Sequence, residues 1–169
     1  KDVGLALLGA LLSQGKSASK TTSQNAASSS GSAEITLPVN IPAAFSLETR
    51  LLSGERSGHL EVGLYASADA VDGYRLVYMG TSRRNLQLIR VERGQEALIA
   101  FYDRPINFED GREHRLAMKR SSRGRIEIAV DSRPVLRVID SAFGRGLRGF
   151  KMTNRGGNYA LRGVVITGN

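Results

Sequence analysis

The sequence predicts an all-β protein whose short antiparallel strands form a sandwich or a barrel. From Glu34 onward, apolar and polar residues alternate along short segments, and a period of two is typical of half-buried strands. About eleven such segments follow one another at a regular spacing with turn residues between them, which favours a sandwich or barrel. No helical periodicity appears after residue 33, which argues against a fold of alternating strands and helices.

The clearest stretch is Gly111–Asp140, which is predicted to form three strands joined by two tight turns. Its strands are His114–Arg120, Arg125–Asp131 and Val135–Ile139. Ser121–Gly124 is short, polar and ends in glycine, which suits a hairpin turn. Asp131–Pro134 is the second turn, and its proline belongs in a turn or at a strand start because it cannot donate to a central ladder.

The remaining predicted strands alternate in the same way. In chain order they are Ile35–Leu37, Phe45–Leu51, Leu60–Ala66, Tyr74–Tyr78, Leu86–Val91, Ala97–Tyr102, Gly149–Met152 and Tyr159–Thr167. Glycine, serine and aspartate fill most of the connections, and Arg104–Gly111 is the longest of those before the central stretch.

The N-terminal segment has a different character. Val3–Leu12 is apolar on nearly every side, so residues 1–13 are predicted to be a short helix whose docking residues are Leu5, Leu7, Leu8, Leu11 and Leu12. Three interpretations stay open: the core of an export signal, a helix docked on a partner subunit or membrane surface, and a helix packed on its own domain. The segment is too short to cross a bilayer.

A linker is predicted to separate this tail from the folded domain. Residues 14–33 are rich in serine, threonine and alanine and contain no large apolar side chain, so they cannot bury enough surface to offset their ordering entropy. The sequence therefore predicts three parts: an apolar tail over 1–13, a flexible linker over 14–33 and a sandwich over 34–169.

The charge and composition narrow the range of partners. The formal net charge is +8, which favours acidic partners such as anionic glycans or lipid headgroups. Tryptophan is absent and aromatic residues make up 6% of the chain, so nucleic-acid binding through stacked bases is not expected. Cysteine is absent, which excludes disulfides, thiolate zinc sites and thiol nucleophiles.

Several segments together resemble the concanavalin A-like, laminin-G-like jelly-roll superfamily. They are Phe45–Arg50, GYRLVY at 73–78, REHRLAMKR at 112–120, GRIEIAVDSRPV at 124–135, RGFKMTN at 148–154 and the closing YALRGVVIT. The likeness spans roughly residues 34–168. Two positions depart from the superfamily's pattern: Ser132, where glycine is frequent, and Glu113, where an aromatic residue is common.

The resemblance implies a jelly-roll sandwich of one convex and one concave antiparallel sheet. It implies binding of glycans or proteins on the concave face or the rim loops, as in relatives, some of which are glycoside hydrolases. The chain also resembles the lectin-like domain of some bacterial OmpA-family surface proteins, which implies export to the periplasm, outer membrane or cell surface. A fold does not by itself choose among these functions.

The carboxylate pattern argues against catalysis. Hydrolytic relatives carry E-x-D-x-x-E on one strand, and no such spacing occurs here. Glu127 and Asp131 are four residues apart, but Asp131 is expected to cap its turn. The sequence contains no strained nucleophile turn such as G-x-S-x-G whose serine His59 or His114 could activate. We expect His114 to be a half-buried structural residue. We therefore expect a non-enzymatic domain.

The candidate ligand-binding residues are basic, with one aromatic neighbour. If Arg90, Arg120 and Arg125 share a sheet face, they form a platform for an anionic ligand. The predicted ligand-binding set is Arg90, Arg120, Arg123, Arg125 and Tyr78. No cofactor is expected, although calcium could bind at Asp69 and Asp72 on a loop.

These observations lead to one functional prediction and two alternatives. The prediction is an exported bacterial domain that binds a glycan or another anionic cell-surface polymer. The first alternative is a structural subunit of an envelope assembly, docked through residues 3–12 on a protein partner or a membrane surface, and this alternative allows an oligomer. The second is a degenerate domain of the glycoside hydrolase kind.

Overall fold

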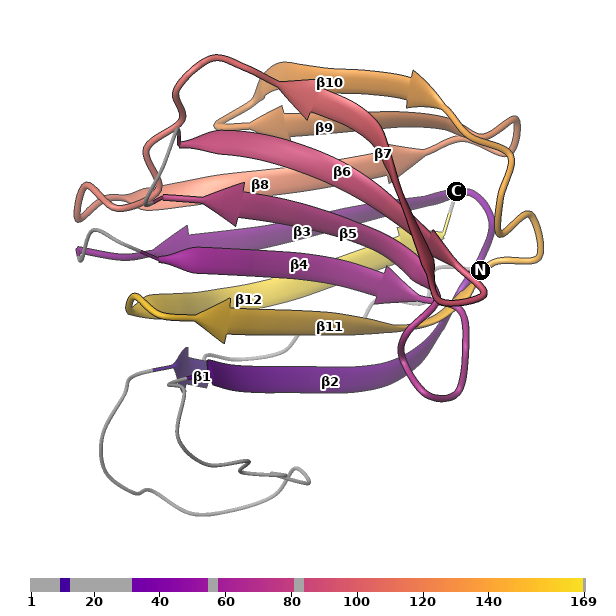
Figure 1. Cartoon of the computed structure of the whole chain (residues 1–169), viewed down its shortest axis with the longest axis horizontal. Coiled ribbons are helices and arrows are strands. Elements are labelled where there is room, and N and C mark those ends of the chain that lie inside the picture. The colour runs from indigo at the N-terminus through magenta and orange to yellow at the C-terminus, as the bar shows by residue number, and fades with distance from the viewer. Residues whose placement is uncertain (1–9, 13–31, 55–57, 81–83, 169) are drawn as a thin grey trace.

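In the computed structural model, the described residues form two antiparallel β-sheets of six strands each, packed face to face (Figure 1). The structure describes residues 10–12, 32–54, 58–80 and 84–168. In chain order the strands are β1 (Ala10–Leu12), β2 (Ser32–Ile41), β3 (Phe45–Leu52), β4 (His59–Tyr65), β5 (Gly73–Met79), β6 (Asn85–Glu92), β7 (Gln95–Tyr102), β8 (Glu113–Arg120), β9 (Arg125–Val130), β10 (Arg133–Ile139), β11 (Leu147–Arg155) and β12 (Tyr159–Gly168). The predicted two-sheet sandwich is confirmed.

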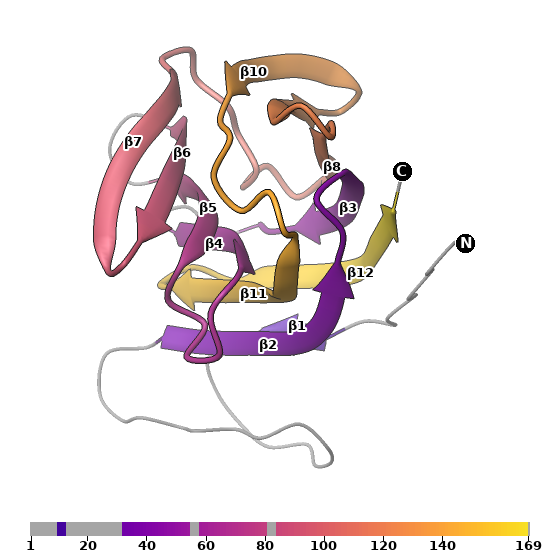
Figure 2. The ribbon, with the colours of Figure 1, turned by 90° about the vertical axis from the view of Figure 1, so that its right-hand side faces the viewer.

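Each sheet combines strands from distant parts of the chain. Sheet A has the order β1-β12-β3-β8-β9-β10, and sheet B has the order β2-β11-β4-β5-β6-β7. Consecutive described strands lie in different sheets at β1 and β2, β2 and β3, β3 and β4, β7 and β8, β10 and β11, and β11 and β12. Figure 2 shows the resulting layers from one end of the sandwich. This is the jelly-roll arrangement that the resemblance implied.

Alternation along the strands places the core between the two sheets. On β3, Phe45, Leu47 and Leu51 face inward and are at most 3% exposed, whereas Glu48 and Arg50 point outward. Burial of such apolar faces is the main favourable contribution to folding. The outward residues of each sheet are therefore the ones available for contact with other molecules.

The central stretch folds into three adjacent strands, β8, β9 and β10, as predicted. The turn before β9 ends in Gly124, where φ is +77° and an added Cβ would lie 2.4 Å from the Asp140 carbonyl oxygen. The turn before β10 is tighter than predicted, because Asp131 and Ser132 both have positive φ and β10 already begins at Arg133. Pro134 therefore lies in a strand, and β10 tolerates it because it is an edge strand with a register shift there.

The N-terminal segment differs from the prediction where it is described. Ala10–Leu12 form β1, an antiparallel strand in which Leu11 lies opposite Ala160 and Leu12 opposite Tyr159, rather than part of a helix. Strand pairing there satisfies backbone groups of β12 that would otherwise lie unpaired at the sheet edge. The other predicted docking residues, Leu5, Leu7 and Leu8, lie outside the described residues. So does most of the predicted linker, although its last two residues begin β2.

The connection between β7 and β8 closes one end of the sandwich. Phe108 is fully buried there, and its ring packs edge-on against that of Tyr78 with the centroids 4.8 Å apart. The neighbouring Glu109 carboxylate is 2% exposed and accepts hydrogen bonds from the Gly58 N–H at 2.7 Å and the Tyr159 hydroxyl at 2.5 Å. This connection therefore joins the core of both sheets. Within the described residues, no helix is long and apolar enough to span a membrane.

Candidate functional site

The three arginines predicted to share a face lie on different surfaces. Arg120 faces the core from β8 and is 3% exposed. Its guanidinium donates to the carbonyls of Ala43 at 2.5 Å and Ala142 at 2.7 Å. Arg125 lies on the outward face of β9, and Arg90 lies in the other sheet. The expected shared platform is therefore not formed.

Arg90 and Tyr78 have contacts inside the sandwich. The Arg90 guanidinium forms an ion pair with Asp140 at 2.7 Å, and the Tyr74 hydroxyl donates to the same carboxylate at 2.8 Å. Burial, together with that hydrogen bond, raises the pKa of the Tyr74 hydroxyl above its usual range. Tyr78 is 1% exposed and donates to the Ile106 carbonyl. These side chains stabilise the fold, whereas Arg123 and Arg125 are exposed to solvent.

The two aspartates predicted as calcium ligands act as acceptors for nearby N–H groups. Asp69 accepts from the Val71 N–H, and Asp72 accepts from the N–H groups of Arg93 and Gly94 at 3.0 Å each. Asp72 thereby ties the β4–β5 loop to the β6–β7 turn. Within the described ranges, no three acidic or histidine side chains gather in a way that could hold a metal. Calcium binding at this loop stays a prediction.

His114 lies between two carboxylates at one end of sheet A. Its Nδ1 is 2.8 Å from Asp131 and its Nε2 is 2.9 Å from Asp110. Asp131 also accepts from the Arg115 N–H, so it joins neighbouring strands rather than only capping its own turn. Burial by itself lowers the pKa of His114, but the hydrogen bonds to Asp131 and Asp110 outweigh burial and raise it. The histidine is therefore a structural group, as predicted from its position.

We expect this histidine to make stability depend on pH. Because the folded-state pKa of His114 is raised above its ordinary value of 6.5, its stabilising contribution is present below that value and is lost as pH rises through the folded pKa. Urea unfolding in steps from about pH 6 to about pH 9 should show a falling free energy of unfolding. The variant His114→Gln should flatten this dependence. If the variant lost as much free energy of unfolding over the same pH range, another group would be responsible for the pH dependence.

A polar groove lies on the outward face of sheet B. It has a volume of about 100 Å³ and crosses β2, β11, β4 and β5. Gly63 and Gly73 line it without side chains, which leaves its floor open. At Gly73 an added Cβ would lie 2.0 Å from the Leu64 carbonyl oxygen, so β4 and β5 approach closely there. The loop before Gly73 forms one wall of the groove.

Charged side chains around the groove are held in pairs. Lys151 is 3.0 Å from Glu34, and Arg75 is 2.8 Å from Glu96. Glu61 is 13% exposed and lies 2.9 Å from the His59 Nε2 and 3.7 Å from Arg155. Such pairing fixes both donors and acceptors in position before any ligand arrives. The groove can therefore offer a ligand both kinds of hydrogen-bonding group.

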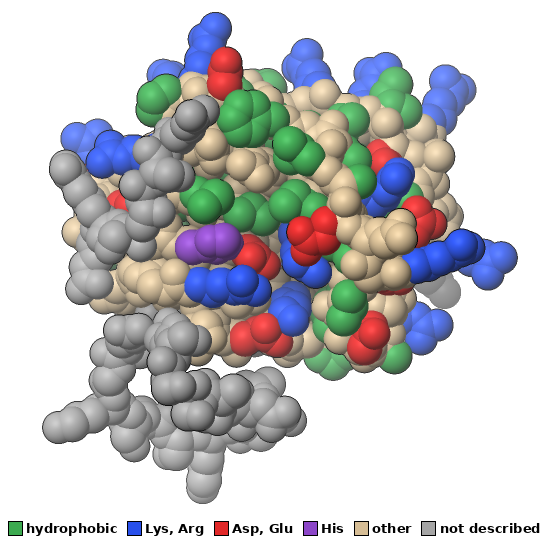
Figure 3. All heavy atoms as spheres, in the orientation of Figure 1, with side chains coloured by type: hydrophobic (Ala, Val, Ile, Leu, Met, Phe, Trp, Pro, Cys, Tyr) green, Lys and Arg blue, Asp and Glu red, His purple; other side chains and the backbone are tan. Residues whose placement is uncertain are grey.

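An apolar strip borders this groove on the side of β6 and β7. Ile89 lies opposite Arg75 in the sheet register, and Leu98 lies opposite Ile89. Leu98 is 58% exposed and Phe101 is 45% exposed. Figure 3 shows this face, with hydrophobic side chains gathered over β5 to β7 and charged side chains over β4 and β11. The face thus offers an apolar surface next to a polar groove.

Sequence reasoning did not find this face. Its polar residues Glu61 and Arg75 lie on the consecutive strands β4 and β5, whereas Lys151 lies on the distant β11, and only the register brings the three together. Each sits at an outward position of an alternating strand, where a charged residue is ordinary. The available signal was the pair of glycines at outward positions within or beside strands, because glycine in a strand often marks a place of close approach.

Comparison with known proteins shows a shared fold but no match in sequence. No protein-family model and no curated sequence matches the chain. The carbohydrate-binding module CBM66 of Bacillus subtilis is similar in structure, with a TM-score of 0.62, 17% identity and 94% of each chain covered. The carbohydrate recognition domain of Emp46p, in a potassium-bound form, has a TM-score of 0.65 at 11% identity, covering 80% of this chain and 77% of that one.

Lectin-like and hydrolytic proteins both occur among the similar structures. The galectin LEC-6 of Caenorhabditis elegans has a TM-score of 0.60 at 14% identity, covering 78% of this chain and 89% of that one. The β-agarase A of Zobellia galactanivorans has a TM-score of 0.63 at 9% identity, covering 80% of this chain and 66% of that one. The chain shares the jelly-roll fold of these lectin-like and hydrolytic structures, as the resemblance implied.

Proposed function

We propose that the chain is a glycan-binding domain without catalytic activity, and that the glycan lies across the outward face of sheet B. The observation that carries the proposal is the groove over Gly63 and Gly73, bordered by fixed polar groups and by the apolar strip. Similar folds described as carbohydrate-binding support a glycan as the class of ligand.

The chemistry of the face suits a sugar ring. Sugar hydroxyls both donate and accept, and the groove presents donors on Lys151 and Arg75 beside acceptors on Glu34 and Glu61. Hydrogen bonds to charged groups are stronger than those between neutral groups. The apolar faces of sugar rings can pack on Ile89, Leu98 and Phe101. Because the ion pairs hold the polar groups in position, little ordering is needed on binding.

The same geometry favours binding over hydrolysis. A glycosidase uses one carboxylic acid as a proton donor and a second carboxylate as base or nucleophile. In the groove, Glu34 is paired with Lys151, and Glu61 with His59 and Arg155. Both carboxylates are thus already engaged by partners within the groove. These pairs support a binding role for both carboxylates.

Binding to immobilised glycans tests the proposal. We expect at least one polysaccharide to bind, and Arg75→Ala to weaken that binding by about tenfold or more through loss of charge-assisted hydrogen bonds. The matched control is Arg115→Ala, which also removes an ion-paired arginine, here one that pairs with Glu48 on the outward face of sheet A. The proposal fails if Arg75→Ala binds like the wild type, or if no glycan binds.

A further inference from the structure

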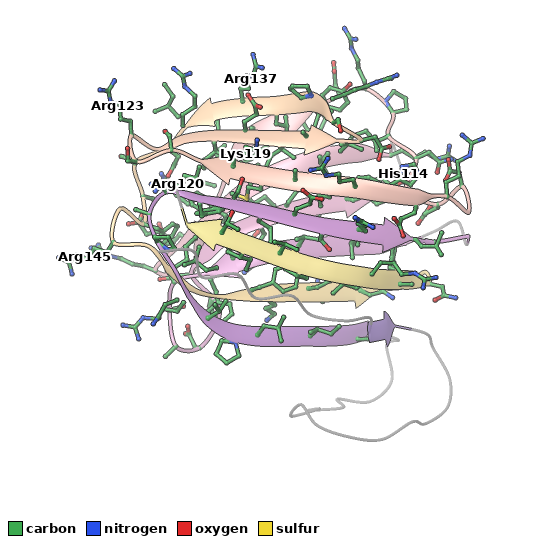
Figure 4. All side chains as sticks on the ribbon, turned by 180° about the vertical axis from the view of Figure 1, so that it is seen from behind. His114, Lys119, Arg120, Arg123, Arg137 and Arg145 are labelled. Atoms are coloured by element: carbon green, nitrogen blue, oxygen red, sulfur yellow. The ribbon has the colours of Figure 1, made fainter. Side chains whose placement is uncertain are left out.

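A second, strongly basic surface lies on the outward face of sheet A. We call it the basic strip, and its cations are Lys119 on β8, Arg123 in the β8–β9 turn, Arg125 on β9 and Arg137 on β10. All four are exposed. One carboxylate, Glu127, lies among them, so four positive charges and one negative charge leave a local net charge of +3. Figure 4 shows Lys119, Arg123 and Arg137 on this side of the molecule.

The register explains why the strip keeps its positive charge. Glu127 lies opposite both Lys119 and Arg137 in the sheet, and it forms an ion pair with Arg137 at 2.8 Å. Within the described residues, no carboxylate lies within ion-pair distance of Lys119, Arg123 or Arg125. Elsewhere on the same face Arg115 is paired with Glu48 and Arg50 with Glu113, whereas the exposed Arg162 on β12 has no carboxylate within ion-pair distance among the described residues. Three unpaired cations, Lys119, Arg123 and Arg125, thus cluster at one end of β8 and β9.

The basic strip contains a shallow depression, and its cations have regular spacings. A shallow depression of about 690 Å³ is lined by Arg125, Glu127, Arg137 and Ile139. Ile139 is 72% exposed and lies opposite Arg125. Residues two apart on a strand are about 6.6 Å apart, and neighbouring strands about 4.8 Å apart, so the backbones of these cations have fixed spacings. The arrangement suits a ligand with repeated anionic groups.

We propose that the basic strip is a second binding site, separate from the groove on sheet B, and that it takes a linear sulfated polysaccharide. Sulfate groups along such a chain match several cations at once, and each contact releases counterions from the polymer. Arginine binds such oxyanions through paired N–H groups. Ile139 offers an apolar contact for the sugar backbone between the sulfates.

Two other polyanions fit the strip less well. Single-stranded nucleic acid binds through aromatic side chains interleaved with cations, and no described residue facing outward from sheet A is aromatic. An anionic bilayer would contact a larger part of this face, including the carboxylates of the half-buried Glu48 and the exposed Glu113. A narrow chain can follow the strip and avoid them.

Titration with dextran sulfate, with neutral dextran of equal length as the reference, tests the proposal. We expect binding to dextran sulfate only, and the double variant Lys119→Gln, Arg125→Gln should weaken it about tenfold and lower its salt dependence. The control double variant Arg104→Gln, Arg112→Gln removes the same charge from exposed positions between β7 and β8. If both double variants lost the same affinity for dextran sulfate, net charge alone would explain the binding, and the proposal would be overturned.

A gain of binding gives a sharper test. Glu127→Gln removes the carboxylate within the strip, so dextran sulfate should bind about twofold to fivefold more tightly than it binds the wild type. Unchanged or weaker binding would contradict the proposed site. Tighter binding of a single-stranded oligonucleotide or of phosphatidylserine vesicles than of dextran sulfate would also overturn it. Arg75→Ala, in the groove on sheet B, should leave dextran sulfate binding unchanged.

Discussion

Replacing Arg120 with methionine should lower the free energy of unfolding by about 3–5 kcal/mol. The guanidinium is buried between the sheets and donates to the carbonyls of Ala43, Asp140 and Ala142. These carbonyls belong to two connections, one before β3 and one after β10. Methionine fills similar space but donates no hydrogen bond, so the buried carbonyls would lose their partner. Urea unfolding followed by circular dichroism measures the change.

A neighbouring residue provides the control for Arg120. Lys119 lies next to it on β8 but points outward and is exposed. Lys119→Met removes the same charge, and surface substitutions of this kind change stability little. Equal destabilisation by the two variants would mean that net charge, and not the buried hydrogen bonds, sets the effect.

Removing the Phe108 ring should lower the free energy of unfolding by about 3–5 kcal/mol. The ring is fully buried against Tyr78, and its centroid is 5.6 Å from that of His114. Phe108→Ala would leave a cavity where the β7–β8 connection meets the core. The cost includes both the lost burial and the contacts that the surrounding side chains lose. The same urea experiment measures it.

Phe101 gives a matched comparison for Phe108. It is also a phenylalanine but is 45% exposed on the outward face of β7. Phe101→Ala should change stability much less and should instead weaken glycan binding. If the two variants lost similar stability, the assignment of Phe101 to the surface and Phe108 to the core would be wrong.

The strands were predictable because alternation is a local signal. In β9, Ile126, Ile128 and Val130 face the core, and each was placed there by its spacing alone. The hairpin turns around β9 were predicted from glycine and turn residues that lie next to each other in the sequence. Where local preference and tertiary structure agree, the sequence alone is enough to predict the strand or turn.

The candidate site was not predictable in the same way, because it depends on register. Arg120 and Arg125 are both arginines in one predicted hairpin, yet one faces the core and the other faces solvent. Alternation does assign them to opposite faces, but it does not reveal the carbonyls that surround Arg120. Likewise, the sequence predicts Tyr78 as a ligand contact, although its position in an alternating strand indicates the core. Pairings such as Lys151 with Glu34 join strands more than a hundred residues apart.

The N-terminal segment illustrates the limit of an apolar pattern. A short apolar run can form either a buried helix or a strand, and periodicity alone does not decide between them. Ala10–Leu12 pair with β12 because the edge of sheet A has backbone groups to satisfy there. That edge is a property of the folded sheet, and the run itself carries no sign of it.

The central claim is that a glycan occupies the groove on the outward face of sheet B. Mapping backbone amide chemical shifts by NMR, with and without the polysaccharide selected on the glycan panel, tests it directly. We predict that the largest shifts cluster at Gly63, Gly73 and Thr153, on β4, β5 and β11. Shifts confined to sheet A, with these amides unmoved at saturation, would contradict it.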